Sequence, residues 1–181
     1  MSNSSEVKQL VKVGIVAAFA TLAFVGTTII RIPIPATGGY FNLGDTFVMI
    51  AALLYGPVIG GLVGLIGPAA ADAVGFPQFI LATAVVKGLE GAAVGAIGGQ
   101  SKSTSAGRII LALVVGIVIL VAGYFVFEAS IYPMLAKTIR FFGVTDAKAA
   151  IAEIIPNLLQ GTISAIIAFG IWRVFRSKVR R

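Results

Sequence analysis

Charged side chains interrupt apolar segments of this chain, and they are the residues best placed to do chemistry. Lys87 and Glu90 lie in an apolar segment between Gln78 and Gln100, and their spacing of three puts both on one helix face. An ionisable group within membrane hydrocarbon costs at least about 2.5 kcal/mol, so it persists mainly where it has a partner or water. The spacing therefore indicates either an internal ion pair or a site that contacts a polar ligand.

Further acidic and amide residues lie near the beginning or end of other apolar segments. They are Asp45, Asp72, Glu128, Asn157 and Gln160. In the topology derived below, these residues converge on one outward-facing region, whereas the opposite halves of the segments contain almost no polar side chains. A cluster of this kind is typical of a binding cavity.

Each of these residues also has a purely structural interpretation. Asp45 is placed to cap a helix, where a carboxylate meets the positive helix end. The two later carboxylates fit charges at the membrane interface, and the lysine and glutamate three apart fit an internal ion pair. The two amides fit interhelical hydrogen bonds worth about 0.6 to 2 kcal/mol each. The sequence alone leaves both interpretations open.

The composition indicates a membrane protein. Of the 181 residues, 58% are hydrophobic and 12% charged, whereas soluble proteins carry about 25% charged residues. The apolar runs are continuous rather than alternating, which favours helices over a barrel. Cys and His are both absent, which excludes thiolate and imidazole metal sites and catalysis by a Cys nucleophile or a His base. No enzyme activity, metal or cofactor is predicted.

The apolar runs predict an all-α integral membrane fold with six transmembrane helices in a single domain, residues 1–181. Within residues 46–71, the pair Gly56-Pro57 favours a turn and a new helix start. The second helix is short for a bilayer, so protein or a cavity must cover one of its ends. The predicted helices cover approximately 9–30, 44–55, 57–74, 78–100, 107–128 and 154–175.

The distribution of Lys and Arg predicts the orientation. With six spans and an internal N-terminus, nine basic residues lie on internal segments and four on external ones, whereas five spans would give five and eight. Because cytoplasmic segments are enriched in basic residues, both termini are predicted to be cytoplasmic. The long connections, 31–44 and 128–153, are then external, and such connections are often lids. The second contains the amphipathic stretch IYPMLAKTIRFF, for which an interfacial linker is an equal alternative.

Rows of small residues predict close helix contacts, because they let backbones approach. Two rows with a spacing of four belong to the third and fourth predicted helices, and packing inside the chain is expected for both: Gly56, Gly60 and Gly64, and Gly91, Gly95 and Gly99. A third row lies in the first helix and could instead receive a partner protein: Gly14, Ala17, Ala18 and Thr21.

Several strings between residues 40 and 95 are distinctive. They are NLGD, Y-G-P, G-x-x-G-P-A-x-A-D and K-G-L-E-G, in this order. In this combination the chain resembles the substrate-binding S components of energy-coupling-factor (ECF) transporters. The resemblance is strongest to the branch grouped with riboflavin, hydroxymethylpyrimidine and pyridoxine uptake.

The resemblance implies a multi-pass protein of the cell membrane that captures a B vitamin or vitamin precursor from outside. Hydroxymethylpyrimidine or a pyridoxine-like compound is the first expectation, and riboflavin the second. The implied partners are a membrane coupling (T) subunit and two cytoplasmic ATPases, which supply the energy, and no nucleic acid. The family usually carries an Ala-x-x-x-Ala docking motif in its first helix. Here the nearest matches are Gly14 with Ala18 and Ala17 with Thr21.

A secondary transporter or channel for a small polar solute is the main alternative, since buried lysines and carboxylates also line ion paths. Such a protein should show polar residues through the inner halves of its spans or matching broken segments in two repeats, and the sequence shows neither. An intramembrane enzyme using Asp45 and Asp72 is a third alternative, without a supporting motif. The predicted substrate-binding residues are Asn42, Asp45, Lys87, Glu90, Glu128, Tyr132, Asn157 and Gln160.

Overall fold

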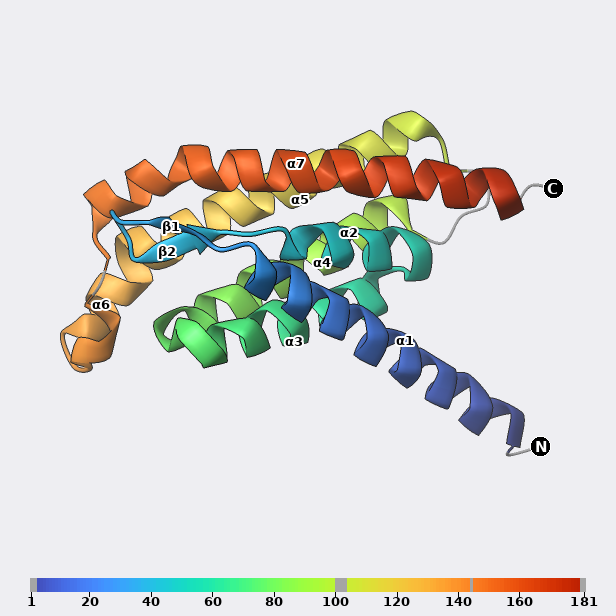
Figure 1. Cartoon of the computed structure of the whole chain (residues 1–181), viewed down its shortest axis with the longest axis horizontal. Helices are drawn as coiled ribbons and strands as arrows, with labels where there is room; N and C mark the ends of the chain where they lie inside the picture. The colour runs from blue at the N-terminus through green and yellow to red at the C-terminus, as the bar shows by residue number, and fades with distance from the viewer. Residues whose placement is uncertain (1–2, 100–103, 144, 180–181) are drawn as a thin grey trace.

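The computed structural model describes residues 3–99, 104–143 and 145–179, and most of them are helical. Five helical segments are long and apolar enough to cross a membrane, and the apolar helix α2 is shorter. This arrangement confirms the predicted all-α membrane fold with six main helices (Figure 1). The main helices are α1 (Asn3–Ile29), α2 (Gly44–Tyr55), α3 (Pro57–Gly75), α4 (Ile80–Gly98), α5 (Ala106–Val126) and α7 (Ala147–Val179).

The break between α2 and α3 falls at the Gly56-Pro57 pair. Gly56 has a φ of 86°, a left-handed conformation that glycine adopts without the clash a side chain would cause. Its N–H closes the last turn of α2 on Ala52 O at 2.9 Å, and Pro57 is the first residue of α3. Most residues of α2 are buried, so the short helix is covered by protein as its length requires.

Helices α3 and α4 pack at backbone distance through their glycine rows. A Cβ atom added to Gly60 would lie 2.7 Å from the carbonyl oxygen of Gly91, and one added to Gly95 would lie 2.5 Å from the backbone of Gly56. A Cβ atom on Gly64 would overlap the carbonyl of Lys87. Real Cβ atoms do not approach other atoms this closely, so both rows serve packing inside the chain, as predicted.

The C-terminal part of the fifth helix continues further than the sequence predicts. After α5 the chain makes a π-helical turn, η2 (Phe127–Ile131), followed by α6 (Tyr132–Ala136) and the 3-10 turn η3 (Arg140–Phe142). Part of the amphipathic stretch that was placed in a connection is therefore helical.

The last helix begins earlier than residue 154, at Ala147. The side chain of Asp146 accepts a hydrogen bond from the N–H of Ala149 at 2.9 Å, which caps the first turn. The predicted connection 128–153 is thereby reduced to the residues between α6 and α7, and Glu153 becomes a helical residue.

A β-hairpin that the sequence did not predict occupies the connection between α1 and α2. Strands β1 (Ile32–Ile34) and β2 (Gly39–Phe41) are antiparallel, with Ile32 opposite Phe41. Gly38 in the turn has a φ of 69°, which again favours glycine. In Figure 1 the hairpin lies toward the end of the bundle opposite the two termini.

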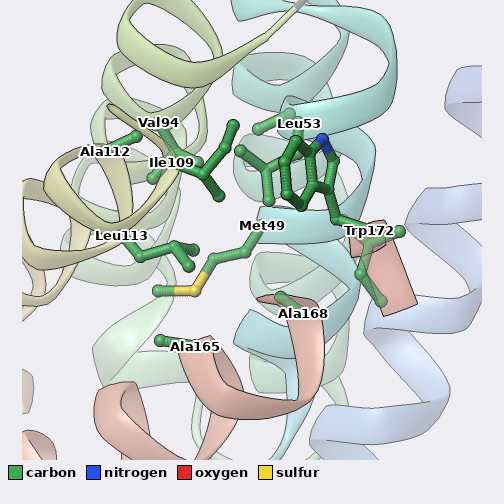
Figure 2. Packing of buried hydrophobic residues seen from close by; sticks show 11 residues of the cluster. Met49, Leu53, Val94, Ile109, Ala112, Leu113, Ala165, Ala168 and Trp172 are labelled. Carbon is green, nitrogen blue, oxygen red and sulfur yellow. The ribbon is translucent and has the colours of Figure 1, made fainter. Parts of the chain in front are cut away.

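The half of the bundle nearest the termini is filled by apolar side chains. Figure 2 shows Met49 and Leu53 of α2 in contact with a layer from α4, α5 and α7. Trp172 of α7 is buried in this cluster. Both termini lie at this end of the bundle in Figure 1.

Candidate functional site

A small polar cavity lies between the hairpin and the helices α3, α4, α5 and α7, in the half of the bundle away from the termini. The space open to a water-sized sphere is about 30 Å³, enough for very few waters. Five of the eight predicted substrate-binding residues line it: Asn42, Lys87, Glu128, Asn157 and Gln160.

Lys87 anchors a buried network on one wall of the cavity. Its ammonium pairs with the carboxylate of Asp45, in the first turn of α2. Gln160 of α7 donates to Asp45 Oδ2 at 2.8 Å and accepts from the backbone N–H of Asn42 at 2.7 Å. The side chain of Asn42 in turn accepts from Gly44 N at 2.9 Å. Three helices are therefore tied together at this wall by fully buried polar contacts.

The remaining three predicted residues lie behind the cavity wall. Asp45 contacts the wall through Lys87 and Gln160, and Glu90 Oε2 lies 4.0 Å from the Lys87 ammonium. The rings of Tyr132 and Phe79 pack edge to face at a centroid distance of 5.9 Å. Its hydroxyl accepts from the N–H of Ala82 at 3.2 Å. These three residues therefore contact residues that line the cavity and do not line it themselves.

Two carboxylates meet on another part of the cavity wall. Glu128 lies in the π-helical turn, and Glu153 lies in the second turn of α7. Glu153 accepts hydrogen bonds from Thr37 in the hairpin and, at 3.3 Å, from Asn157 Nδ2. Glu128 accepts no hydrogen bond from an N–H or hydroxyl donor, and its carboxyl lies beside that of Glu153. This wall therefore offers unused hydrogen-bond acceptors to the cavity.

The hairpin is fastened to α3 by a cluster around Arg31. Tyr40 donates a hydrogen bond to Asp72, and the Arg31 guanidinium lies 5.1 Å from the Tyr40 ring centroid and 5.3 Å from that of Phe76. Arg31 also donates to Ala71 O at 2.9 Å. Burial, assisted by the neighbouring Asp72 charge, raises the pKa of Tyr40 above its usual value, so the phenol stays protonated and acts as the donor.

Several lining residues escaped the sequence-based site prediction. Tyr124 and Thr83 share a hydrogen bond of 2.8 Å between their hydroxyls, and the Lys87 ammonium lies 5.5 Å from the Tyr124 ring centroid. Tyr124 precedes Glu128 by four residues, a spacing that places two helical side chains on one face. Glu153 follows the Asp146 cap and was assigned to a connection. The spacing between Tyr124 and Glu128 and the capping residue Asp146 ahead of Glu153 can both be read from the sequence.

The predicted docking residues lie on the exposed face of α1, and none of them lines the cavity. Gly14, Ala17, Ala18 and Thr21 are all exposed, and a Cβ atom on Gly14 would meet nothing within 4 Å. An apolar groove of about 610 Å³ runs beside them between α1 and α3. The cavity and this face are therefore separate parts of the molecule.

Comparison with known proteins agrees with this architecture. Residues 4–176 match the sequence model of the family described as ECF-type riboflavin transporter, S component. A relative from Pyrococcus woesei, described as an uncharacterized protein in gap 3'region, is 35% identical over 155 residues, which are 86% of this chain and 95% of the relative.

A solved structure described as the S component of a bacterial ECF transporter has the same fold. It superposes with a TM-score of 0.71 at 17% sequence identity, over 96% of this chain and 99% of the other. With nearly the whole sequence matched, the chain belongs to the family of ECF-type riboflavin transporter S components, the substrate-binding membrane subunits of these transporters.

Proposed function

We propose that this S component captures a small heteroaromatic B vitamin or vitamin precursor from outside the cell. The observation that carries the proposal is the position of the polar cavity. Its walls bear Lys87, Glu128, Asn157 and Gln160 at one end of the bundle, above an inner half packed with apolar side chains. A site of this kind can bind a polar solute near one face of the membrane without forming a continuous polar path through the membrane.

Hydroxymethylpyrimidine or a pyridoxine-like compound remains the first candidate. Aromatic side chains, Tyr40, Phe79 and Tyr124, line the cavity beside its polar groups and suit the faces of a flat ring. The available space is about 30 Å³, so any vitamin must displace part of the wall. A single ring requires a smaller displacement than the three fused rings of riboflavin, the vitamin that the family description names, so riboflavin remains the second candidate.

The energy for uptake is proposed to come from partner subunits. The family relationship supports a membrane coupling subunit and cytoplasmic ATPases as these partners. The exposed row of small residues on α1 is the proposed docking face, because a partner helix approaches most closely where side chains are small. ATP hydrolysis would then occur entirely outside this chain.

The orientation is proposed from charge. Both termini lie at one end of the bundle in Figure 1, and the segments predicted to be internal carry nine basic residues against four on the external ones. The positive-inside rule then places the termini in the cytoplasm and the hairpin outside. Reporter fusions after residue 181 should report a cytoplasmic location, and a periplasmic or external signal would reverse the proposed direction of capture.

A thermal-shift titration of the purified chain in detergent tests the substrate class. Hydroxymethylpyrimidine, pyridoxine and riboflavin are the probes, and pantothenate, a B vitamin without an aromatic ring, is the control. A ligand at 100 times its dissociation constant stabilises the folded state by about 2.7 kcal/mol. We expect this stabilisation from at least one aromatic probe and none from pantothenate. Failure of all three aromatic probes would contradict the proposal.

A further inference from the structure

The carboxylates of Glu128 and Glu153 face the same cavity and are almost completely buried. Glu128 is 1% exposed and Glu153 4% exposed, and both line the cavity. They are close enough for the charge of one to act on the other. Two like charges in a dry environment repel, and each loses its hydration. Their juxtaposition therefore needs a compensating group.

No basic side chain in the described part of the chain supplies that compensation. The ion pairs at 4.0 Å or less among the described residues use Lys87, with Asp45 and with Glu90 as partners. The Arg31 guanidinium lies over the Tyr40 ring and donates a hydrogen bond to the Ala71 carbonyl. Among the described residues, no cation lies within 4.0 Å of the Glu128 and Glu153 carboxylates, and the ammonium of Lys87 on the same cavity is paired with Asp45.

Glu153 and Glu128 differ in the hydrogen bonds that their carboxyl oxygens accept. Both oxygens of Glu153 are oriented by donors, one by Thr37 and one by Asn157. Neither side-chain oxygen of Glu128 accepts a hydrogen bond from an N–H or hydroxyl donor, and the polar group beside it is the Glu153 carboxyl. A buried acceptor left unsatisfied costs about 1 to 3 kcal/mol, and more when it is charged. Glu128 is thus the acceptor that a ligand gains most by contacting.

The backbone around Glu128 is also unusual. Residues Phe127–Ile131 form a π-helical turn in which the N–H of Tyr132 bonds to Phe127 O, five residues earlier. Such single π turns occur frequently at functional sites. The Glu128 carbonyl accepts a hydrogen bond from the Thr145 hydroxyl at 3.1 Å, so the widened turn is supported from the start of α7. The turn is therefore a built feature that presents Glu128 to the cavity.

We propose that Glu128 and Glu153 form a subsite for the nitrogen edge of an amino-substituted heteroaromatic substrate. This inference rests on the proposed function and narrows its substrate class. A ring nitrogen that carries a proton and an adjacent exocyclic amino group present two parallel N–H donors, which match the two oxygens of a carboxylate. The positive charge shared by such an edge offsets the repulsion between the two glutamates.

A pair of carboxyl groups that shares one proton is the competing explanation. One protonated glutamate would donate to the other and reduce the repulsion without any ligand. In that case the pair would be structural, and the protein would have no preference for donor-rich substrates. The two explanations therefore differ in ligand selectivity.

The test compares two probes that differ at one position. The first is 4-amino-5-hydroxymethyl-2-methylpyrimidine, and the second is its analogue with oxygen in place of the 4-amino group. Isothermal titration of the purified full chain should show about 10- to 100-fold tighter binding of the amino compound, the range expected for charge-assisted hydrogen bonds. This comparison requires no variant, so it does not depend on the folding of a mutant.

The variants E128Q and E153Q then assign the preference to the two carboxylates. Each should reduce the ratio of the two affinities to less than about threefold, because a neutral amide pairs with either compound. Ser164→Ala is the matched control, since Ser164 is buried in α7 and does not line the cavity. It should keep the wild-type ratio.

The outcomes separate this inference from the proposed function. Equal binding of both pyrimidines, binding of riboflavin alone, or an unchanged preference in both variants would overturn the carboxylate subsite while leaving a heteroaromatic substrate in place. Failure of every aromatic probe to bind would overturn both.

Discussion

The Lys87 ammonium of α4 and the Asp45 carboxylate of α2 form an ion pair in which the side chains are 1% and 0% exposed. The N-cap residue of α2 is Leu43, whose side chain makes no cap hydrogen bond, and the N–H of Gly44 in the first turn donates to Asn42 at 2.9 Å rather than to Asp45. Asp45 is therefore a charge partner rather than the helix cap that its position also suggested. The pair joins the cavity wall to a helix that ends in the apolar half.

Breaking this pair on one side should be costly. Lys87→Met leaves the Asp45 carboxylate buried without its cation, and such changes destabilise by about 3 to 5 kcal/mol. Adding Asp45→Asn removes the orphaned charge, so the double variant should be more stable than Lys87→Met alone. Unfolding of the purified chain in detergent measures both effects. If the two substitutions are simply additive, the pair does not contribute as a unit.

Truncation of the α7 amides should weaken ligand binding. Asn157→Ala removes a cavity-lining amide without leaving an unpaired charge, and the loss of one such contact costs about 1 to 3 kcal/mol, hence about 5- to 150-fold in affinity. Gln160→Ala should show a similar loss together with lower stability, because Gln160 also bridges Asp45 and Asn42. Titration with the best ligand of the wild type measures both, with Ser164→Ala as control. Wild-type affinity in both folded variants would make these amides packing residues only.

The glycine contact between α3 and α4 predicts a sharp contrast between two identical substitutions. Gly64→Ala places a methyl group on the Lys87 carbonyl and should destabilise by about 1 to 3 kcal/mol, as overpacking does. Gly170→Ala in α7 meets nothing within 4 Å and should stabilise by about 0.5 to 1 kcal/mol through helix propensity. Thermal unfolding of both variants tests this contrast. Equal stability changes would contradict the close packing.

Bulk on the exposed face of α1 should separate uptake from binding. Gly14→Leu and Ala18→Leu fill the row of small residues without reaching the cavity, so transport with partner subunits should fall while substrate affinity of the isolated subunit stays unchanged. Val114→Leu adds bulk to an exposed position of α5 and should leave both properties unchanged. An equal loss of binding in the α1 variants would show that these residues serve the fold of the subunit.

The helical layout could be predicted because the signals that define it are local. Continuous apolar runs and the Gly56-Pro57 pair depend on neighbouring residues, and the basic-residue count separated six spans from five. The glycine rows likewise indicate close packing at a spacing that any helix imposes. The hairpin and the π-helical turn at Glu128 escaped prediction, because a three-residue strand and one extra residue in a turn leave no periodicity to detect.

The site could be predicted in part for a related reason. Polar residues inside apolar spans are conspicuous, so Lys87, Asn157 and Gln160 were identified. Glu153 was assigned to a connection because the cap at Asp146 was not recognised as a helix start. Tyr124 is amphipathic and gives no such contrast, so only its spacing of four residues from Glu128 indicates its place at the cavity.

Uptake of labelled substrate into vesicles is the most direct test of the central claim that this chain captures a heteroaromatic vitamin for ATP-driven import. Vesicles that contain the chain with a coupling subunit and ATPases should accumulate the best-binding aromatic probe only when ATP is present on the side of the membrane where the ATPases are bound. Vesicles with the chain alone should bind the probe without accumulating it. Accumulation by the chain alone, independent of ATP, would contradict the account and would instead favour a secondary transporter or channel.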